Sequence, residues 1–139
     1  MIYNSYSALD TAKVGKEFAK NASPGDVICL SGDLGAGKTV FAGGFAKGLG
    51  LKNDITSPTF TILNEYHEGR LSLYHFDLYR IEDANELHGI GYEEYFFGEG
   101  VTLIEWPERA VQLIPPNAVR INIETDFELD LSFRRITVN

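Results

Sequence analysis

Apolar residues in the first third of the chain recur at helical spacing on both sides of a short apolar run. One helical stripe follows Ser7, and Asp10, three positions later, completes a capping-box-like start. This pattern predicts a helix over residues 7–20. Residues 26–31 form a short, β-branched apolar run that is typical of a buried strand. Residues 39–49 again carry apolar side chains at helical spacing and predict a second helix.

The rest of the chain alternates β-rich runs with short helical segments. Residues 59–66 and 70–76 flank a short turn that contains Gly69, which predicts a β-hairpin. Further on, the pattern predicts short helices over residues 81–88 and 92–97, a strand over 101–105 and a short helix over 107–111. Residues 117–124 and 128–138 predict a C-terminal antiparallel hairpin. There is no repeat and no linker, so we expect one mixed α/β domain over residues 1–139.

The net charge narrows the class of partners. The chain has 12 Lys and Arg residues against 20 Asp and Glu residues, which gives a formal net charge of −8. Proteins that bind nucleic acids usually present a basic face, because neutralised phosphates supply much of the affinity. The longest basic run here is Arg134–Arg135. We therefore do not expect this chain alone to bind RNA or DNA strongly.

Two further features of the sequence favour a soluble, cytosolic protein. No run approaches the ~20 apolar residues of a membrane span, and residues 1–5 lack the pattern of a secretory signal peptide. Cys29 is the single cysteine, so an internal disulfide is excluded. Its position inside an apolar strand predicts a core residue and not a reactive thiol.

The most specific motif lies between the strand at 26–31 and the helix at 39–49. Residues 32–39 read Gly-Asp-Leu-Gly-Ala-Gly-Lys-Thr, which matches the P-loop pattern G-x-x-x-x-G-K-[ST]. In such a loop the backbone N–H groups cradle phosphate oxygens, the lysine reaches the β- and γ-phosphates, and the hydroxyl binds Mg²⁺. These roles fall on Lys38 and Thr39. We therefore predict a nucleoside-triphosphate site.

Hydrolysis also needs a metal-binding carboxylate and a group that positions water. Glu105 follows the apolar run 101–104, and Asp77 follows the run 73–76. An acid at the end of a strand is also a common turn residue or helix cap. Because a P-loop is present, we expect at least one of these two acids to belong to the site.

Other candidate residues each have a structural and a functional interpretation. The hydroxyl groups of residues 56–59 follow the P-loop helix, either as a switch-like segment that meets the γ-phosphate or as an ordinary Ser-Pro turn. His75 is expected to be packed or hydrogen-bonded, and not catalytic. Trp106 would stack on a nucleotide or partner, or cap the core. Arg80 would lie near the phosphates or on the solvated surface.

Four motifs, in this order and spacing, resemble the TsaE family of small bacterial P-loop ATPases, also called YjeE. They are the P-loop at 32–39, Ser-Pro-Thr-Phe at 57–60, His-Phe-Asp-Leu-Tyr-Arg at 75–80 and Glu-Trp-Pro at 105–107. The first occurs in many NTPases, whereas the other three together are specific to this family. The resemblance covers nearly the whole chain. It implies a P-loop NTPase of the α/β class, with a mixed central sheet flanked by helices and with β-hairpins.

The resemblance also implies a function. TsaE-like proteins are cytoplasmic ATPases required to make threonylcarbamoyladenosine (t6A) in tRNA, and they do not transfer the threonylcarbamoyl group themselves. They bind the TsaB–TsaD pair, and their hydrolysis of ATP is tied to the multiple turnover of that pair. The implied cofactors are ATP and Mg²⁺. The tRNA would be met only indirectly, through the partners, which agrees with the acidic charge, and no membrane is involved.

Individual roles follow from the same resemblance. Thr39 and Glu105 resemble the Mg²⁺ ligands, and Asp77 resembles the acid needed for hydrolysis, whether as base, water-positioning group or neighbour of the metal's waters. Lys38 is the third catalytic residue. The remaining implied positions are the ATP-binding residues Asp33, Leu34, Gly35, Ala36, Gly37, Lys38, Thr39 and Glu108, the switch-like residues Ser57 and Thr59, and two contacts with nucleotide or partner, Trp106 and Arg80.

One position departs from the family pattern. Family members often carry Arg or Lys just before the second glycine of residues 41–44, where this chain has Gly43. Each glycine inside a helix costs about 1 kcal/mol of stability relative to alanine. If the usual basic residue contacts a partner or a nucleotide, that contact is missing here.

Two other functions are compatible with the P-loop. A small-molecule kinase would pass the γ-phosphoryl group to an acceptor, but it usually needs a lid with several arginines, and the six arginines here are scattered. A nucleotide-dependent switch module would signal through its conformation, without an essential hydrolytic role. The guanine-reading motif Asn/Thr-Lys-x-Asp is absent from the sequence, which favours ATP.

Overall fold

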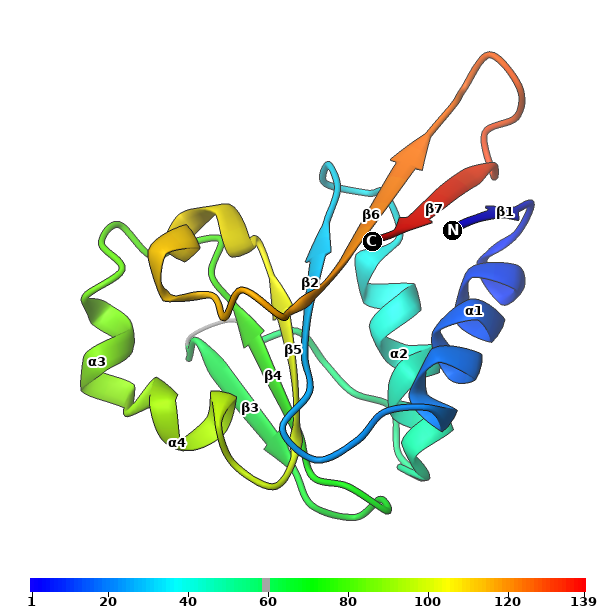
Figure 1. The fold of residues 1–139 in the computed structure, drawn as a ribbon. Helices are drawn as coiled ribbons and strands as arrows, with labels where there is room; N and C mark the ends of the chain where they lie inside the picture. The colour runs from blue at the N-terminus through cyan, green and yellow to red at the C-terminus, as the bar shows by residue number, and fades with distance from the viewer. Residues whose placement is uncertain (59–60) are drawn as a thin grey trace.

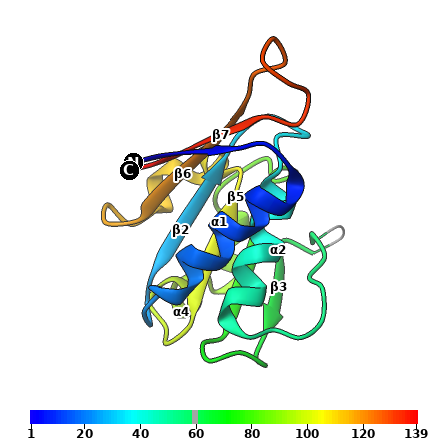
Figure 2. The same cartoon turned by 90° about the vertical axis from the view of Figure 1, so that its right-hand side faces the viewer.

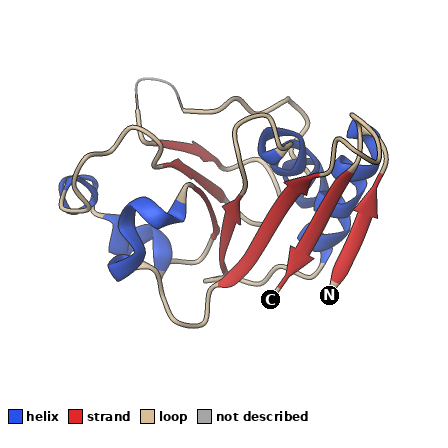
Figure 3. Ribbon diagram, turned by 90° about the horizontal axis from the view of Figure 1, so that it is seen from above, coloured by secondary structure: helices blue, strands red, loops and turns tan. Residues whose placement is uncertain are grey.

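A mixed sheet separates two groups of helices in the computed structural model, which describes residues 1–58 and 61–139 (Figure 1). The strands follow the order β1-β7-β6-β2-β5-β4-β3. Helices α1 and α2 cover one face, and α3, α4 and the 3₁₀ helix η1 cover the other (Figure 3). The strands are β1 Ile2–Ser5, β2 Val27–Ser31, β3 Leu63–Tyr66, β4 Leu73–Asp77, β5 Val101–Glu105, β6 Val119–Thr125 and β7 Arg134–Val138. The helices are α1 Ala8–Lys20, α2 Lys38–Leu49, α3 Glu86–Ile90, α4 Tyr92–Phe96 and η1 Pro107–Leu113.

The four central strands of the sheet, β6, β2, β5 and β4, run parallel. In β2, Ile28 and Leu30 face the core under α1 and α2, whereas Val27 and Cys29 face the core on the other side. Both faces are covered, so this strand is apolar without alternation. The carboxyl ends of β2, β5 and β4 meet at one edge of the sheet, because Glu105 is in register with both Leu30 and Asp77. This edge brings the P-loop and the two acids together.

Glycines let α1 and α2 pack closely. A Cβ atom at Gly44 would lie 2.0 Å from the carbonyl oxygen of Ala12, and one at Gly15 would lie 2.3 Å from that of Phe41. At Gly43, by contrast, a Cβ atom would meet nothing within 4 Å. The two adjacent glycines therefore differ in purpose, because only Gly44 is needed for the backbone contact between the helices.

The two ends of the chain lie side by side (Figure 2). Strand β1 pairs antiparallel with β7, and the terminal ammonium group of Met1 donates to the carbonyl of Val138 at 3.0 Å. The sequence pattern did not predict β1, because its four residues show no clear alternation and depend on β7 for pairing. Among the described residues, no helix has both the length and the apolar character needed to cross a membrane.

Most of the predicted elements are confirmed. The helix over 7–20 has Ser7 as its N-cap, whose side chain accepts from the N–H of Asp10. The Asp10 carboxylate accepts from the N–H of Tyr6 and not from that of Ser7, so the capping box is incomplete. The P-loop strand, the P-loop helix, the strand at 101–105, the helix at 92–97 and both hairpins are present.

Three predicted elements are wrong in extent, because side-chain hydrogen bonds hold the backbone in turns. The helix expected from Ile81 begins only at Glu86, whose carboxylate accepts from the N–H groups of Glu82 and Asp83. The strand expected from Arg70 begins at Leu73, because the Arg70 guanidinium and N–H bind carbonyl groups near the ends of α1 and α2. The last strand begins at Arg134 and not at residue 128, because Asp130 fixes a turn before it.

Two smaller differences concern the ends of other segments. The helix predicted over 107–111 is a 3₁₀ helix that extends to Leu113, with a kink at Ala110. The first hairpin strand begins at Leu63 and is shorter than the predicted run. That predicted run includes residues 59 and 60, which lie outside the described residues.

The two helix glycines give opposite predictions for stability. Gly43→Ala should raise the free energy of unfolding by about 1 kcal/mol, because the site is open and alanine favours the helix. Gly44→Ala should lower it by roughly 1–3 kcal/mol, because the new methyl group would meet the backbone of α1. Urea unfolding of the two variants measures both effects. Equal shifts of the same sign would contradict this account of the α1–α2 contact.

Candidate nucleotide site

A cavity of about 370 Å³ opens at the carboxyl edge of β2, β5 and β4. It is lined by residues from four motifs that are far apart in the sequence: Leu34, Gly35, Gly37, Lys38, Thr39, Val40, Ser57, Asp77, Tyr79, Glu105 and Trp106. The parallel register of the strands brings these segments to the same place. This is the position at which open α/β sheets bind ligands.

The P-loop has a backbone shape that depends on glycine. Gly35 and Gly37 have φ values of +80° and +106°, in the left-handed region that residues with a Cβ atom rarely adopt. At Gly32 a side chain is excluded by lack of space, since a Cβ atom there would lie 2.5 Å from the carbonyl oxygen of Ile123. The loop then leads directly into α2, whose first residue is Lys38. A helix N-terminus of this kind favours anionic ligands.

Lys38 is buried at the centre of the site. Its ammonium group donates to the carbonyl of Gly32 and lies 3.6 Å from the centroid of the Trp106 ring, in a cation–π contact. Burial lowers the pKa of Lys38, while four acids, Glu105, Glu108, Asp77 and Asp33, act in the opposite direction. The lysine is thus held at the mouth of the P-loop by an aromatic face and a carbonyl.

Glu105 is paired with His75 inside the protein. His75 Nε2 and Glu105 Oε2 are 2.7 Å apart, and the two side chains are only 1% and 4% exposed. A carboxylate oxygen accepts hydrogen bonds, so Nε2 carries the hydrogen. The other ring nitrogen, Nδ1, is buried and has no partner among the described residues. The expectation that His75 is hydrogen-bonded is confirmed, and its position behind Glu105 restricts the orientation of that carboxylate.

Asp77 lies beside Glu105 and is half-buried. Desolvation by burial raises the pKa of Asp77, and the nearby Glu105 adds to the effect. The backbone N–H of Tyr79 donates to Asp77 Oδ1 at 3.0 Å and opposes it, as do His75 and Lys38. The site therefore disfavours two full negative charges at neighbouring positions.

The oxygen groups at the site suit a Mg²⁺ ion. Thr39 Oγ1 lies 3.5 Å from Ser57 Oγ, and both residues line the cavity with the carboxyl groups of Asp77 and Glu105. In the described part of the chain, no group of three or more His, Cys, Asp and Glu residues could hold a metal ion by itself. Mg²⁺ usually takes one or two protein oxygens, with waters and substrate phosphates as the other ligands, so the residues fit this ion.

The other predicted residues lie around this cavity. Asp33 and Ala36 line a neighbouring cavity of about 320 Å³ between the P-loop and the end of β6. Arg80 lines another, of about 460 Å³, which shares Ser57, Asp77 and Tyr79 with the candidate site. Glu108 is exposed and does not line the main cavity, although its charge acts on Lys38. Thr59 lies outside the described residues.

Two contacts at the site were not predicted, namely the packing of the candidate residue Trp106 on Tyr79 and the bonds of Arg134. Trp106 has a left-handed backbone with φ +59°, the one such non-glycine residue in the described ranges. Its ring packs on that of Tyr79, with centroids 4.9 Å apart, so the tryptophan caps the site from the side. Arg134, at the start of β7, binds the carbonyl groups of Gly35 and Ala36. Only the folded hairpin brings it there.

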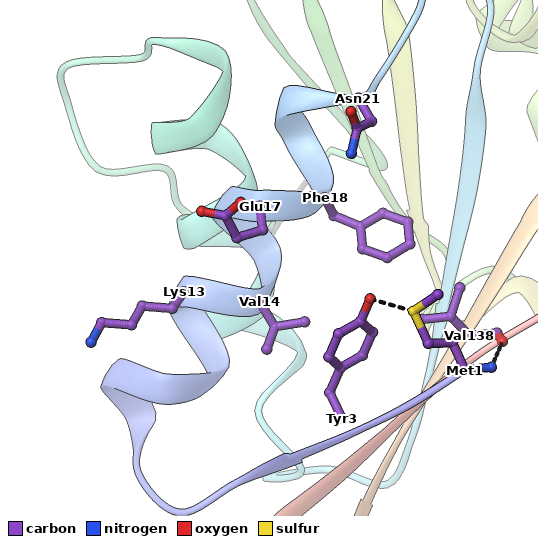
Figure 4. Close-up of a pocket in the computed structure, with 8 residues that line it drawn as sticks. All are labelled: Met1, Tyr3, Lys13, Val14, Glu17, Phe18, Asn21 and Val138. Carbon is purple, nitrogen blue, oxygen red and sulfur yellow. Dashed lines mark hydrogen bonds between the residues drawn. The ribbon is translucent and has the colours of Figure 1, made fainter.

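A larger cavity, of about 610 Å³, lies elsewhere and lacks comparable chemistry. It is formed between α1, the edge strand β1 and its neighbour β7, and Figure 4 shows Tyr3, Val14 and Phe18 pointing into it. Lys13 and Glu17 lie at its rim, and Tyr3 donates a hydrogen bond to the Met1 sulfur. Cys29 does not line the candidate site. It is buried, which confirms it as a core residue, and burial raises the pKa of its thiol to about 11.

Comparison with known proteins decides the family. A family model described as threonylcarbamoyl adenosine biosynthesis protein TsaE matches residues 5–134. This chain belongs to the TsaE family. It is 46% identical over 129 residues to the tRNA threonylcarbamoyladenosine biosynthesis protein TsaE of Bacillus subtilis, covering 91% of this chain and 80% of that protein. The TsaE of Treponema pallidum is 46% identical, with 86% and 87% covered.

A solved structure has the same architecture. YdiB of Bacillus subtilis superposes with a TM-score of 0.80 at 40% identity, covering 99% of this chain and 83% of that one. The predicted α/β fold with its mixed, helix-flanked sheet is therefore confirmed. The family model and the named relatives confirm the resemblance to the TsaE family.

The pKa of Asp77 leads to a prediction for the nucleotide-free protein. A raised pKa means that stability contributed by this group is full below the ordinary value of 3.8 and is lost as the pH rises through the folded-state value. Asp77→Asn removes the titrating group, so the variant does not lose this stability as the pH rises. The asparagine keeps an acceptor for the Tyr79 N–H. The variant should therefore gain stability over the parent as the pH is raised from 3.5 to about 7, in chemical unfolding. Asp54→Asn, at an exposed site, is the control, and an equal pH dependence for both variants would contradict the assignment.

Proposed function

We propose that this chain is a Mg²⁺-dependent ATPase that acts with the TsaB–TsaD pair in the formation of threonylcarbamoyladenosine in tRNA. The observation that carries the proposal is the single cavity in which the P-loop, Lys38, Thr39, Asp77 and Glu105 meet. Membership of the TsaE family supports the pathway, because the matched relatives are named for this modification.

The residues of the site divide the chemistry between them. The N–H groups of the P-loop and the first turn of α2 would bind the phosphate oxygens, and Lys38 would bind the β- and γ-phosphates as a point charge. When bound, Mg²⁺ supplies charge neutralisation at the phosphate oxygens that develop charge during transfer. Thr39 and Glu105 would hold it, and the hydrogen bond from His75 fixes the orientation of the Glu105 carboxylate.

Asp77 is the remaining acid at the cavity and is the group we assign to the attacking water. Burial raises the pKa of Asp77, and a higher pKa makes the carboxylate a stronger base toward the proton of the water. The Tyr79 N–H fixes one carboxyl oxygen and leaves the other for a water molecule. Asp77 would thereby orient that water, and accept its proton as the phosphate bond breaks.

The competing kinase and switch functions make different demands of this site. A kinase would need a second substrate beside the γ-phosphate, and the cavity lined by Arg80, which shares Ser57, Asp77 and Tyr79 with the candidate site, is one space for it. A switch module would need nucleotide binding but no turnover. Product analysis separates the three, since only the ATPase releases inorganic phosphate without a phosphorylated acceptor.

Substitutions at Lys38 and Glu105 should have different effects on binding and turnover. Lys38→Ala should weaken ATP affinity by roughly tenfold or more, because a charge-assisted contact with the phosphates is lost. Glu105→Gln should leave metal-free nucleotide affinity within about twofold but remove most of the gain in affinity and turnover that Mg²⁺ gives. Trp106, the single tryptophan of the chain, reports binding by fluorescence.

The exposed acid Glu68, in the turn between β3 and β4, provides the matched control for that pair. Glu68→Gln removes a charge away from the cavity, so its Mg²⁺ dependence should equal that of the parent protein. Unaltered ATP affinity in Lys38→Ala would refute the P-loop assignment. Equal losses in Glu105→Gln with and without Mg²⁺ would refute Glu105 as a metal ligand.

The partnership gives a separate prediction. The isolated chain should hydrolyse ATP slowly, and the rate should rise when TsaB and TsaD are added, because switch-like sites are commonly completed by a partner. Phosphate release measured with and without the pair tests this, and the Lys38→Ala variant corrects for background hydrolysis. A rate that does not change on addition of the pair would contradict the partner assignment while leaving the ATPase itself intact.

A further inference from the structure

The guanidinium group of Arg134 connects the P-loop to the opposite end of the sequence. Its Nε–H donates to the carbonyl of Ala36 at 2.8 Å, and Nη2 donates to the carbonyl of Gly35 at 3.3 Å. Nη1 donates to the carbonyls of Leu131 and Phe133 at 2.9 and 2.7 Å. All four contacts are with backbone oxygens, and two of them span 98 and 99 residues of sequence.

These bonds restrict the direction of the P-loop peptide groups. In a trans peptide unit the carbonyl and the following N–H point in opposite directions. The bond from Arg134 to the carbonyl of Ala36 therefore directs the N–H of Gly37 away from Arg134. Gly37 lines both the candidate nucleotide cavity and a separate cavity of about 160 Å³ that Arg134 lines. The peptide thus lies between the guanidinium group and the proposed phosphate site.

The P-loop has few internal restraints of its own. Within residues 32–37, all of them described, one backbone hydrogen bond is present, from the N–H of Ala36 to the carbonyl of Asp33. Gly35 and Gly37 have positive φ values, and glycine has the widest choice of backbone conformations. A loop of this kind needs restraint from outside if its N–H groups are to be oriented before the ligand arrives.

From this arrangement we infer that Arg134 is a positioning residue for the P-loop, which holds the peptide groups of residues 35–37 in the orientation that receives the phosphates of a nucleoside triphosphate. The inference rests on the proposed function. The role requires arginine, because its planar group directs several N–H donors at fixed angles, whereas a lysine ammonium is a point charge on a flexible stem. The positive charge alone does not perform it.

The neighbouring Arg135 offers a matched control. Its guanidinium lies 5.5 Å from the Phe133 ring centroid, and no contact of Arg135 with the P-loop is present in the described structure. Arg134→Gln and Arg135→Gln remove the same charge at adjacent positions. Only the first removes the bonds to the P-loop carbonyls.

Amide hydrogen exchange in the nucleotide-free protein is the direct test. Arg134→Gln should raise the exchange rate of the Ala36 amide by about tenfold. This N–H is bonded to the carbonyl of Asp33 and belongs to the peptide unit whose Gly35 carbonyl Arg134 holds. Arg135→Gln should leave that rate unchanged. Equal rates in the parent and the Arg134 variants would overturn the inference. So would an increase that is the same throughout the sheet, because that would indicate a general loss of stability.

Nucleotide affinity, followed through Trp106 fluorescence, completes the test. Both Arg134→Gln and the milder Arg134→Lys should raise the Kd for ATP by roughly tenfold, whereas Arg135→Gln should not. Full recovery of affinity in Arg134→Lys would show that charge alone matters and would overturn the inference. Absence of ATP binding in the parent protein would refute the proposed function. Normal binding in the parent and in both Arg134 variants would refute only the role of Arg134.

Discussion

The parallel register of β2, β5 and β4 is the constraint on which the site depends. It places Glu105 beside Leu30, the last apolar residue before the P-loop, and beside Asp77 on the other side. A shift of one residue in either pair would turn Glu105 to the opposite face of the sheet, away from Lys38. The buried, two-sided core prevents such a shift, because each face of β2 packs against its own group of helices.

This register places two carboxyl groups side by side, and a small number of neighbouring groups stabilise them. The buried carboxyl group of Glu105 and the half-buried one of Asp77 lie together at this edge, and burial acts against the charged form of Asp77. Lys38 provides a positive charge that acts on both acids, the hydrogen bond from His75 stabilises the Glu105 carboxylate, and the Tyr79 N–H stabilises that of Asp77. A divalent cation bound with the phosphates would add positive charge at this edge. It would attract both carboxylates, although the two carboxylates repel each other.

The sequence predicted those parts of the site that depend on local motifs. The P-loop, the helix after it and the strand that ends at Glu105 were found because glycine spacing and apolar runs act within about ten residues. The bond between His75 and Glu105, and the contacts of Arg134, were not predicted, because they join residues that only the sheet brings together. The turn over residues 82–85 was missed for another reason, since the Glu86 side chain competes with the helix for the N–H groups of Glu82 and Asp83.

The charge of the chain separates two kinds of phosphate recognition. A nucleotide is bound by a few oriented dipoles and one lysine, which act over short distances and tolerate an acidic surface. A tRNA presents many phosphates over a long path, and a chain of net charge −8 is not expected to bind it strongly alone. Under the proposed function, the tRNA is therefore held by the partner proteins. Under the same proposal this chain contributes the nucleotide site, and the bonds of Arg134 to the carbonyls of Gly35 and Ala36 restrain the P-loop from within the chain.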